Sequence, residues 1–145
     1  MFKSVLVIIK NSKGEFFLHR RRKNKLLAPD SYALGAAGKS KIGESAAAAA
    51  TRELFEETGI RANPHFLFQI PGRHLPIIYK VYVFEILWDK EISPSLKEWS
   101  WSAWVNKNDI KIYLSGKNNR RNNLKDKQKI YIDMLNAWDR YQKAF

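Results

Sequence analysis

Cysteine is absent from the 145-residue chain. A chain without thiols forms no disulfide, no thiolate zinc site and no cysteine nucleophile, so it makes no use of an oxidising compartment. Long apolar runs are scarce as well. The early run over residues 5–9 is shorter than the apolar core of a signal peptide and far short of the roughly 20 residues that cross a bilayer. We therefore expect a cytoplasmic protein without a membrane partner.

Acidic residues are few: 14 Asp and Glu stand against 26 Lys and Arg, which leaves a formal net charge of +12. Residues 1–43 carry ten basic and two acidic side chains, residues 44–105 six and eight, and residues 106–145 ten and four. A strongly basic chain favours polyanionic partners. We expect a small nucleotide as the partner, and the net charge keeps RNA open as a second one. The oligomeric state stays open, with a dimer among the options.

Length and composition favour one folded domain over residues 1–145. At this length a chain buries about two-thirds of its unfolded surface, which suffices for one hydrophobic core. Hydrophobic residues make up 45% of the chain and aromatic residues 13%, which is too many for a disordered protein.

Local patterns predict several strands and two long helices. Runs rich in β-branched residues, interrupted by turn residues, predict strands over 2–10 and 15–22, joined as a hairpin, and a short strand near 32–36. Helix-forming residues followed by Gly59 predict a helix over 45–58. Further strands are expected over 66–70, 75–88 and 98–105. A polar connector over 118–123 then leads into an amphipathic helix from residue 122 onward.

The predicted helix over 45–58 carries three carboxylates on one face. Glu53, Glu56 and Glu57 lie at i, i+3 and i+4 and occupy an arc of about 100°. Like charges at this spacing repel, so a compensating cation is implied. Arg52 reaches Glu56 at i+4, but one guanidinium does not neutralise three carboxylates. A hard divalent ion with oxygen ligands does, and Mg²⁺ or Mn²⁺ is the natural candidate.

We expect the opposite face of this helix to pack on a sheet and to hold the carboxylates outward. That face consists of Ala47, Thr51, Leu54, Phe55 and Thr58. Taken alone, the hexapeptide from Arg52 to Glu57 is more typical of a solvated helix face than of a metal site.

The surrounding residues change that interpretation. From Gly38 to Ile60 the chain reads GKSKIGESAAAAATRELFEETGI, which resembles the Nudix box in every specified position. The matching residues are Gly38, Glu44, Arg52, Glu53, Leu54, Glu56, Glu57, Gly59 and Ile60.

The resemblance implies an α/β fold, a Nudix-type α/β/α sandwich around a central mixed sheet. It also implies hydrolysis of a diphosphate linked to another moiety, with Mg²⁺ or Mn²⁺ as the cofactor. By resemblance, the metal ligands are Glu53, Glu56, Glu57 and the backbone carbonyl of Gly38. Glu44 adds to the surroundings of the metal, and Arg52 orients a carboxylate of the box.

The general base is left open between a glutamate of the box and an acid outside it. Our outside candidate is Glu98, which precedes a Trp-rich strand as an acid does in many relatives. The alternative is an ordinary carboxylate on a strand surface. We thus predict Arg52, Glu53 and Glu98 as the catalytic side chains.

Four basic residues are candidates for substrate binding. Arg20 and Arg21 end a predicted strand, so their side chains point to opposite faces and at most one face meets a given phosphate. Lys39 and Lys41 flank the predicted metal loop and are the stronger candidates. For the two arginines a solvated cluster is the alternative.

Aromatic and histidine residues give weaker signals. Trp99 and Trp101 are expected on one side of a strand, where packing in the core or on the sheet surface is favoured over stacking on a base. His19, His65 and His74 lack zinc-site spacing, and structural or surface roles are expected.

Within the family, residues 19–43 look like the branch of isopentenyl diphosphate isomerases and their hydrolase relatives. Those isomerases use a catalytic cysteine, which this chain lacks, so hydrolysis is favoured. The expected substrate is a nucleoside triphosphate or a nucleotide sugar. One alternative is a pyrophosphohydrolase acting on RNA 5′ ends, and another is a non-catalytic nucleotide-binding or RNA-binding module on the same fold.

Overall fold

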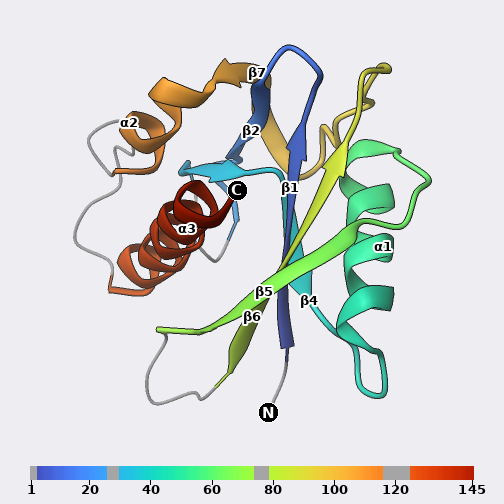
Figure 1. Cartoon of the computed structure of the whole chain (residues 1–145). Coiled ribbons are helices and arrows are strands. Elements are labelled where there is room, and N and C mark those ends of the chain that lie inside the picture. Colours follow the sequence, from blue (N-terminus) through green and yellow to red (C-terminus); the bar gives the residue numbers. More distant parts are fainter. Residues whose placement is uncertain (1–2, 26–29, 74–78, 116–124) are drawn as a thin grey trace.

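The computed structural model describes residues 3–25, 30–73, 79–115 and 125–145, with side chains from residue 133 onward in the last range. Figure 1 shows the arrangement of the elements along the chain. They are β1 Lys3–Lys10, β2 Glu15–Arg21, β3 Tyr32–Leu34, β4 Ala36–Lys39, α1 Ala46–Thr58, β5 His65–Pro71, β6 Lys80–Leu87, β7 Trp99–Asn106, the short 3-10 helix Lys107–Asp109, α2 Ile110–Leu114 and α3 Lys125–Ala144.

The strands form one mixed sheet with the order β3-β2-β1-β6-β5, while β4 also pairs with β1 and β7 with β2. The β1–β6 pair is parallel, and the other pairs are antiparallel. Helix α1 covers one face, and α2 and α3 cover the other (Figure 1). The predicted α/β/α sandwich around a mixed sheet is therefore confirmed.

Strand β1 is central because both of its faces are buried. Val5, Val7 and Ile9 point into the core beneath α1, where Ala49, Ala50 and Leu54 of the helix meet them. Leu6 and Ile8 point into the other core, which Trp138 and Tyr141 of α3 close from outside. This double burial explains why the sequence reads as a continuous apolar run rather than an alternating one.

The predicted hairpin is present but short. Its turn is closed by hydrogen bonds from the Asn11 N–H to the Glu15 carbonyl (3.0 Å) and from the Gly14 N–H to the Asn11 carbonyl (3.1 Å). Strands β1 and β2 pair at Lys10 and Phe16, and the other half of β1 pairs with β4 instead. The sequence predicted one short strand near 32–36 and missed β4.

Gly35 is the reason for two strands in place of one. Its φ of 57° lies in the left-handed region and breaks the extended run between β3 and β4. A Cβ atom at this position would lie 1.8 Å from the backbone oxygen of Val7. Only glycine lets the chain turn here against β1.

Helix α1 has the predicted ends. Ser45 caps it by accepting a hydrogen bond from the Ala48 N–H at 3.1 Å. Gly59 has a φ of 76°, and its N–H donates to the Phe55 carbonyl at 2.8 Å.

The predicted buried face of α1 is wrong in part. Leu54 and Thr58 are buried as expected, but Ala47 and Phe55 are exposed, and Ala49 and Ala50 are buried in their place. At 100° per residue, the helix is turned by about a quarter of a turn from the prediction, toward its acidic residues. A run of five alanines carries no hydrophobic contrast that would fix this rotation from the sequence.

The remaining predicted elements agree with the structure where it describes them. The strand predicted over 66–70 is β5, the one over 98–105 is β7, and the terminal helix is α3. Strand β6 begins at Lys80; the first part of the strand predicted over 75–88 and the connector predicted over 118–123 lie outside the described residues. Helix α2 was not predicted. Within the described residues, no helix has the length and apolar character needed to cross a membrane.

Candidate active site

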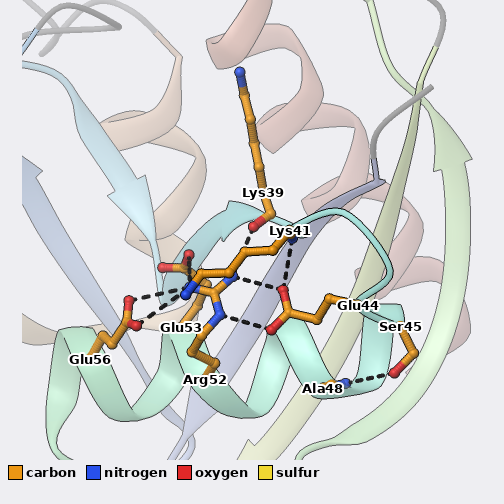
Figure 2. A network of polar contacts seen from close by, with 8 residues as sticks. All are labelled: Lys39, Lys41, Glu44, Ser45, Ala48, Arg52, Glu53 and Glu56. Atoms are coloured by element: carbon orange, nitrogen blue, oxygen red, sulfur yellow. Dashed lines mark hydrogen bonds and ion pairs between the residues drawn. The ribbon is translucent and has the colours of Figure 1, made fainter.

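The candidate site lies along α1 where the helix faces β4 and the loop that precedes the helix. Figure 2 shows Arg52 at the centre of a polar network on this side of the helix. Its Nε and Nη2 donate to the two carboxylate oxygens of Glu44 at 2.8 and 2.9 Å. Its Nη2 also donates to the Lys39 carbonyl at 2.9 Å. The guanidinium therefore ties the start of the loop to the helix.

The same guanidinium contacts two carboxylates of the helix. Nη1 of Arg52 lies 2.8 Å from an oxygen of Glu53 and 3.3 Å from one of Glu56. The predicted i, i+4 contact between Arg52 and Glu56 is thus present. The Glu53 side chain is 14% exposed and that of Glu56 is 51% exposed, so these two carboxylates differ in their access to water.

This network changes the pKa values of its members. Hydrogen bonds from Arg52, and then from the Lys41 N–H at 2.9 Å, lower the pKa of Glu44 to about 2. The hydrogen bond with Glu44 is the main reason that the pKa of Arg52 is raised above its usual value. Both groups stay charged at all ordinary pH values.

Glu57 lies on the sheet side of the helix, opposite to the prediction that α1 holds its carboxylates outward. Its Oε1 accepts a hydrogen bond from the backbone N–H of Ala37 in β4 at 3.0 Å. Burial raises the pKa of Glu57 to about 8, although the Ala37 hydrogen bond works in the opposite direction and the charge of Glu53 adds to the rise.

Glu53 shares this environment. Burial is the main cause that raises its pKa, against the hydrogen bond from Arg52. Its carboxyl group lies directly on the backbone of Gly38, where an added Cβ would sit 2.2 Å from the Glu53 Cδ. Gly38 is therefore required because β4 and the carboxyl of Glu53 approach closely.

Arg21 and Glu98 lie near Glu57. Burial lowers the pKa of Arg21, while the charges of Glu57 and Glu98 oppose that change. Glu98 forms an ion pair with Lys25, and the Ser95 N–H donates to the Glu57 carbonyl at 2.9 Å. The loop before β7 is thereby attached to the end of α1, and it brings Glu98 to the same side of the sheet.

Arg20 points to the other face, as alternation along β2 requires. Its Nε lies 3.0 Å from an oxygen of the Asp30 carboxylate, and its guanidinium lies 4.9 Å from the centre of the Tyr32 ring. The structure therefore brings Arg21, but not Arg20, to the carboxylates of α1.

The two lysines of the loop belong to the site through their backbone. The Lys39 carbonyl accepts from Arg52, and the Lys41 N–H donates to Glu44. Figure 2 shows the Lys39 side chain extending away from the carboxylates.

Trp99 and Trp101 lie on different sides of β7, so the expectation that they share one side is wrong. The register between β2 and β7 shifts at Arg20 and Arg21, which pair with Trp101 and Trp99. This bulge turns Trp99 into the core beneath α1. Trp101 is 37% exposed and stacks on Tyr113 of α2. Packing in the core, the favoured interpretation, is correct for Trp99.

Three features of this site were not predicted from the sequence. They are the hydrogen bond from the Ala37 N–H to Glu57, the ion pair between Lys25 and Glu98, and the position of His19. His19 is buried beside Trp99, as its expected structural role requires, whereas His65 is exposed. His74 lies outside the described residues. All three features depend on contacts between segments that are far apart in the sequence, and no local pattern predicts them.

The residues fit a divalent cation by their chemistry. Mg²⁺ and Mn²⁺ take carboxylate and carbonyl oxygens as ligands. Burial raises the pKa values of Glu53 and Glu57, so a cation would stabilise their charged forms, and the absence of a side chain at Gly38 leaves room for the Glu53 carboxyl against β4. Within the part of the chain that the structure describes, no three acidic or histidine side chains already converge on one point.

Comparison with known proteins places the chain among relatives. The NUDIX domain family matches residues 2–127. An uncharacterized Nudix hydrolase from Streptomyces coelicolor is 32% identical over 108 residues, which cover 70% of this chain and 58% of that protein. The chain spans about half the length of the curated relatives it matches.

Solved structures show the same fold. The MutT protein from Methanosarcina mazei Go1 superposes with a TM-score of 0.72 at 26% identity, covering 98% of this chain and 95% of the other. The NUDIX domain of Shewanella oneidensis NrtR, solved in complex with ADP ribose, gives a TM-score of 0.67 at 13% identity, covering 97% and 86%.

Proposed function

The chain belongs to the Nudix hydrolase family, whose members act on pyrophosphate bonds, and from this premise we propose that it is a divalent-metal-dependent pyrophosphohydrolase. Its substrate is a nucleoside diphosphate derivative, either a nucleoside triphosphate or a nucleotide sugar. In this proposal residues 1–145 form one domain that carries the reaction, and the reaction takes place in the cytoplasm.

The observation that carries this proposal is the position of Glu57. Burial and the charge of Glu53 raise the pKa of Glu57 to about 8, against the hydrogen bond from the Ala37 N–H. Such an arrangement destabilises the free protein when the carboxyl is charged, and a bound cation would remove that penalty. Arg52 cannot supply the charge, because its five donors already serve Glu44, Glu53, Glu56 and the Lys39 carbonyl.

In this proposal the metal ligands are Glu53, Glu56, Glu57 and the Gly38 carbonyl. A bound Mg²⁺ or Mn²⁺ supplies charge neutralisation on the diphosphate and a lower pKa for attacking water. The Ala37 N–H fixes the rotamer of Glu57, and Arg52 fixes Glu53 and Glu56 against the loop.

The other predicted site residues would act on the attacking water and on the substrate. Glu98 receives the proton of the attacking water, and Lys25 forms an ion pair with its carboxylate. Arg21, Lys39 and Lys41 contact substrate phosphates. Arg20 contributes only if a substrate reaches around the edge of the sheet, because Asp30 engages it on the far face.

Product analysis tests the proposal. The purified protein is incubated with Mg²⁺ and, separately, nucleoside triphosphates, nucleotide sugars, dinucleotides and triphosphorylated RNA, and the products are separated by chromatography. Metal-dependent release of a nucleoside monophosphate supports the proposal. No product from any of the small substrates contradicts it. A protein carrying Glu57→Gln serves as the control for contaminating hydrolases.

Hydrolysis at RNA 5′ ends is the second candidate, favoured by the basic terminal thirds of the chain. Each phosphate that a protein neutralises releases counterions, so the logarithm of RNA affinity would fall steeply with the logarithm of salt concentration. A flat salt response together with hydrolysis of small nucleotides would remove this candidate. A non-catalytic binding module would show nucleotide binding and no product at all.

A further inference from the structure

His19 is a buried polar side chain that has no role in the proposed reaction as described so far. It lies on β2 between Phe17 and Arg21, on the face that α1 covers, and it is 2% exposed. Burial lowers its pKa to about 3. The imidazole is therefore neutral at ordinary pH and does not serve as a cation for phosphate.

One edge of the ring holds the turn into β4. Nδ1 of His19 lies 2.7 Å from the carbonyl oxygen of Gly35. A carbonyl only accepts, so Nδ1 carries the proton and donates it. Gly35 is the residue whose left-handed backbone starts β4, and that strand supplies the Ala37 N–H for Glu57 and the backbone on which Glu53 lies.

The face of the ring holds the start of β7. The rings of His19 and Trp99 stack with centroids 4.1 Å apart and 7° between their planes. Trp99 reaches this face because of the bulge opposite Arg20 and Arg21. Glu98 directly precedes Trp99, and its carbonyl accepts from the Arg22 N–H at 3.1 Å.

We propose that His19 is a positioning residue for the hydrolytic reaction: its Nδ1–H to Gly35 and its stack on Trp99 set the separation between β4 and Glu98. The turn before β4 and the start of β7 supply the two sides of the site, and the His19 side chain contacts the first through Gly35 and the second through Trp99. This inference rests on the proposed function, because it takes Glu53, Glu57 and Glu98 as working residues.

Two variants separate the two contacts. His19→Phe keeps a ring for Trp99 and removes the donor to Gly35, whereas His19→Asn keeps a donor near the Nδ1 position and removes the stack. A displacement of about 1 Å in a catalytic site lowers turnover by up to about 100-fold. We expect kcat to fall by roughly 10-fold or more in each variant.

Measurements of Mg²⁺ affinity distinguish a positioning role for His19 from a role in the stability of the fold alone. Because β4 carries the contacts to Glu53 and Glu57, His19→Phe is expected to weaken Mg²⁺ affinity by about 10-fold in calorimetry. His19→Asn is expected to leave that affinity within about twofold and to lower kcat through Glu98 alone. The matched control is His65→Phe, a change at an exposed histidine of β5, which is expected to change neither quantity.

Two results would overturn the inference. Folded variants that keep the wild-type kcat and Mg²⁺ affinity would reduce His19 to a core residue. In the wild-type protein, ¹⁵N NMR of the imidazole is expected to show the Nδ1–H tautomer; an Nε2–H tautomer would remove the contact to Gly35, and this measurement decides the case even if neither variant folds. Failure of the proposed function would show differently, as an absence of hydrolysis by the wild-type protein itself.

Discussion

Glu57 of α1 accepts a hydrogen bond from the backbone N–H of Ala37 in β4 at 3.0 Å, so this carboxyl group of the box helix is turned toward the sheet rather than toward water. Backbone donors hold a carboxylate in one orientation without introducing a competing charge. The helix rotation that buries Ala49 and Ala50 is what brings Glu57 to this position. Packing of small side chains against the sheet thereby determines the geometry of the acidic face.

The substitution Glu57→Gln should abolish most of the activity while the fold is kept. The amide oxygen can still accept from Ala37, but it provides no charge for a metal ion. Altering even an indirect partner of a metal ligand lowers activity by about 10- to 100-fold, so loss of the ligand should lower kcat by about 100-fold or more. Steady-state kinetics on the substrate found by product analysis would measure this, with circular dichroism as the check on folding. Turnover near the wild-type value would contradict the assignment of Glu57.

The metal-free protein should lose stability as pH rises through the range set by Glu57. Its pKa is about 8 in the folded state against 4.5 as the ordinary value. Between these values the folded state binds more protons than the unfolded state, so the free energy of unfolding falls with rising pH. Urea unfolding in EDTA at pH 5, 6, 7 and 8 should show this decline.

Glu57→Gln is the matched control for that slope, because glutamine does not titrate. The variant should unfold with a weaker dependence on pH between 5 and 8, and it should be more stable than the wild-type protein at pH 8 in EDTA. Equal slopes in the two proteins would mean that Glu57 is solvated in the free state.

Binding of Mg²⁺ should release protons at neutral pH. A ligand carboxyl with a raised pKa is partly protonated before binding and must be deprotonated to coordinate the ion. Calorimetry in buffers of different ionisation enthalpy measures the number of protons released. That number should be larger at pH 6.5 than at pH 8.5.

Mg²⁺ should also raise the melting temperature of the wild-type protein more than that of Glu57→Gln.

The box helix shows which parts of the site local sequence determines. Ser45 and Gly59 fix the ends of α1 through hydrogen bonds within a few residues, and the sequence predicted both ends. The rotation of the helix was predicted wrongly, because alanines on every side of its first turns leave the choice of face to the sheet. Alternation along β2 separated Arg20 from Arg21 correctly, since period two is a local property.

Contacts between segments that are far apart in the chain could not be predicted from the sequence. The bulge opposite Arg20 and Arg21 places Trp99 on the other side of β7 from the one that strict alternation predicts. No residue type in β7 indicates that a bulge is present. The partner of His19 is the carbonyl of Gly35, and backbone carbonyls have no sequence signature. Positions of this kind are defined when the sheet assembles, and they decide how β4 and Glu98 face α1.

Replacing Gly38 with alanine should damage the site through Glu53. The added Cβ would lie 2.2 Å from the Glu53 Cδ, so the carboxyl must move. We expect kcat to fall by about 10-fold or more and the melting temperature to drop. In a double variant with Glu53→Ala the clash is absent, so Gly38→Ala should then have little further effect on melting. Strictly additive losses of stability would show that the two residues are not in contact.

Glu98→Gln should lower kcat and change the pH profile. In the proposed role this carboxylate takes a proton from the attacking water, and glutamine cannot. The acidic limb of kcat/KM that belongs to the base should disappear or shift. Lys25→Met offers a comparison, because it removes the ion pair with Glu98 but keeps the carboxylate. That variant is expected to keep more activity than Glu98→Gln, because the carboxylate that takes the proton is still present. An unaltered profile in Glu98→Gln would leave Glu98 as a surface carboxylate and assign the proton transfer to a glutamate of α1.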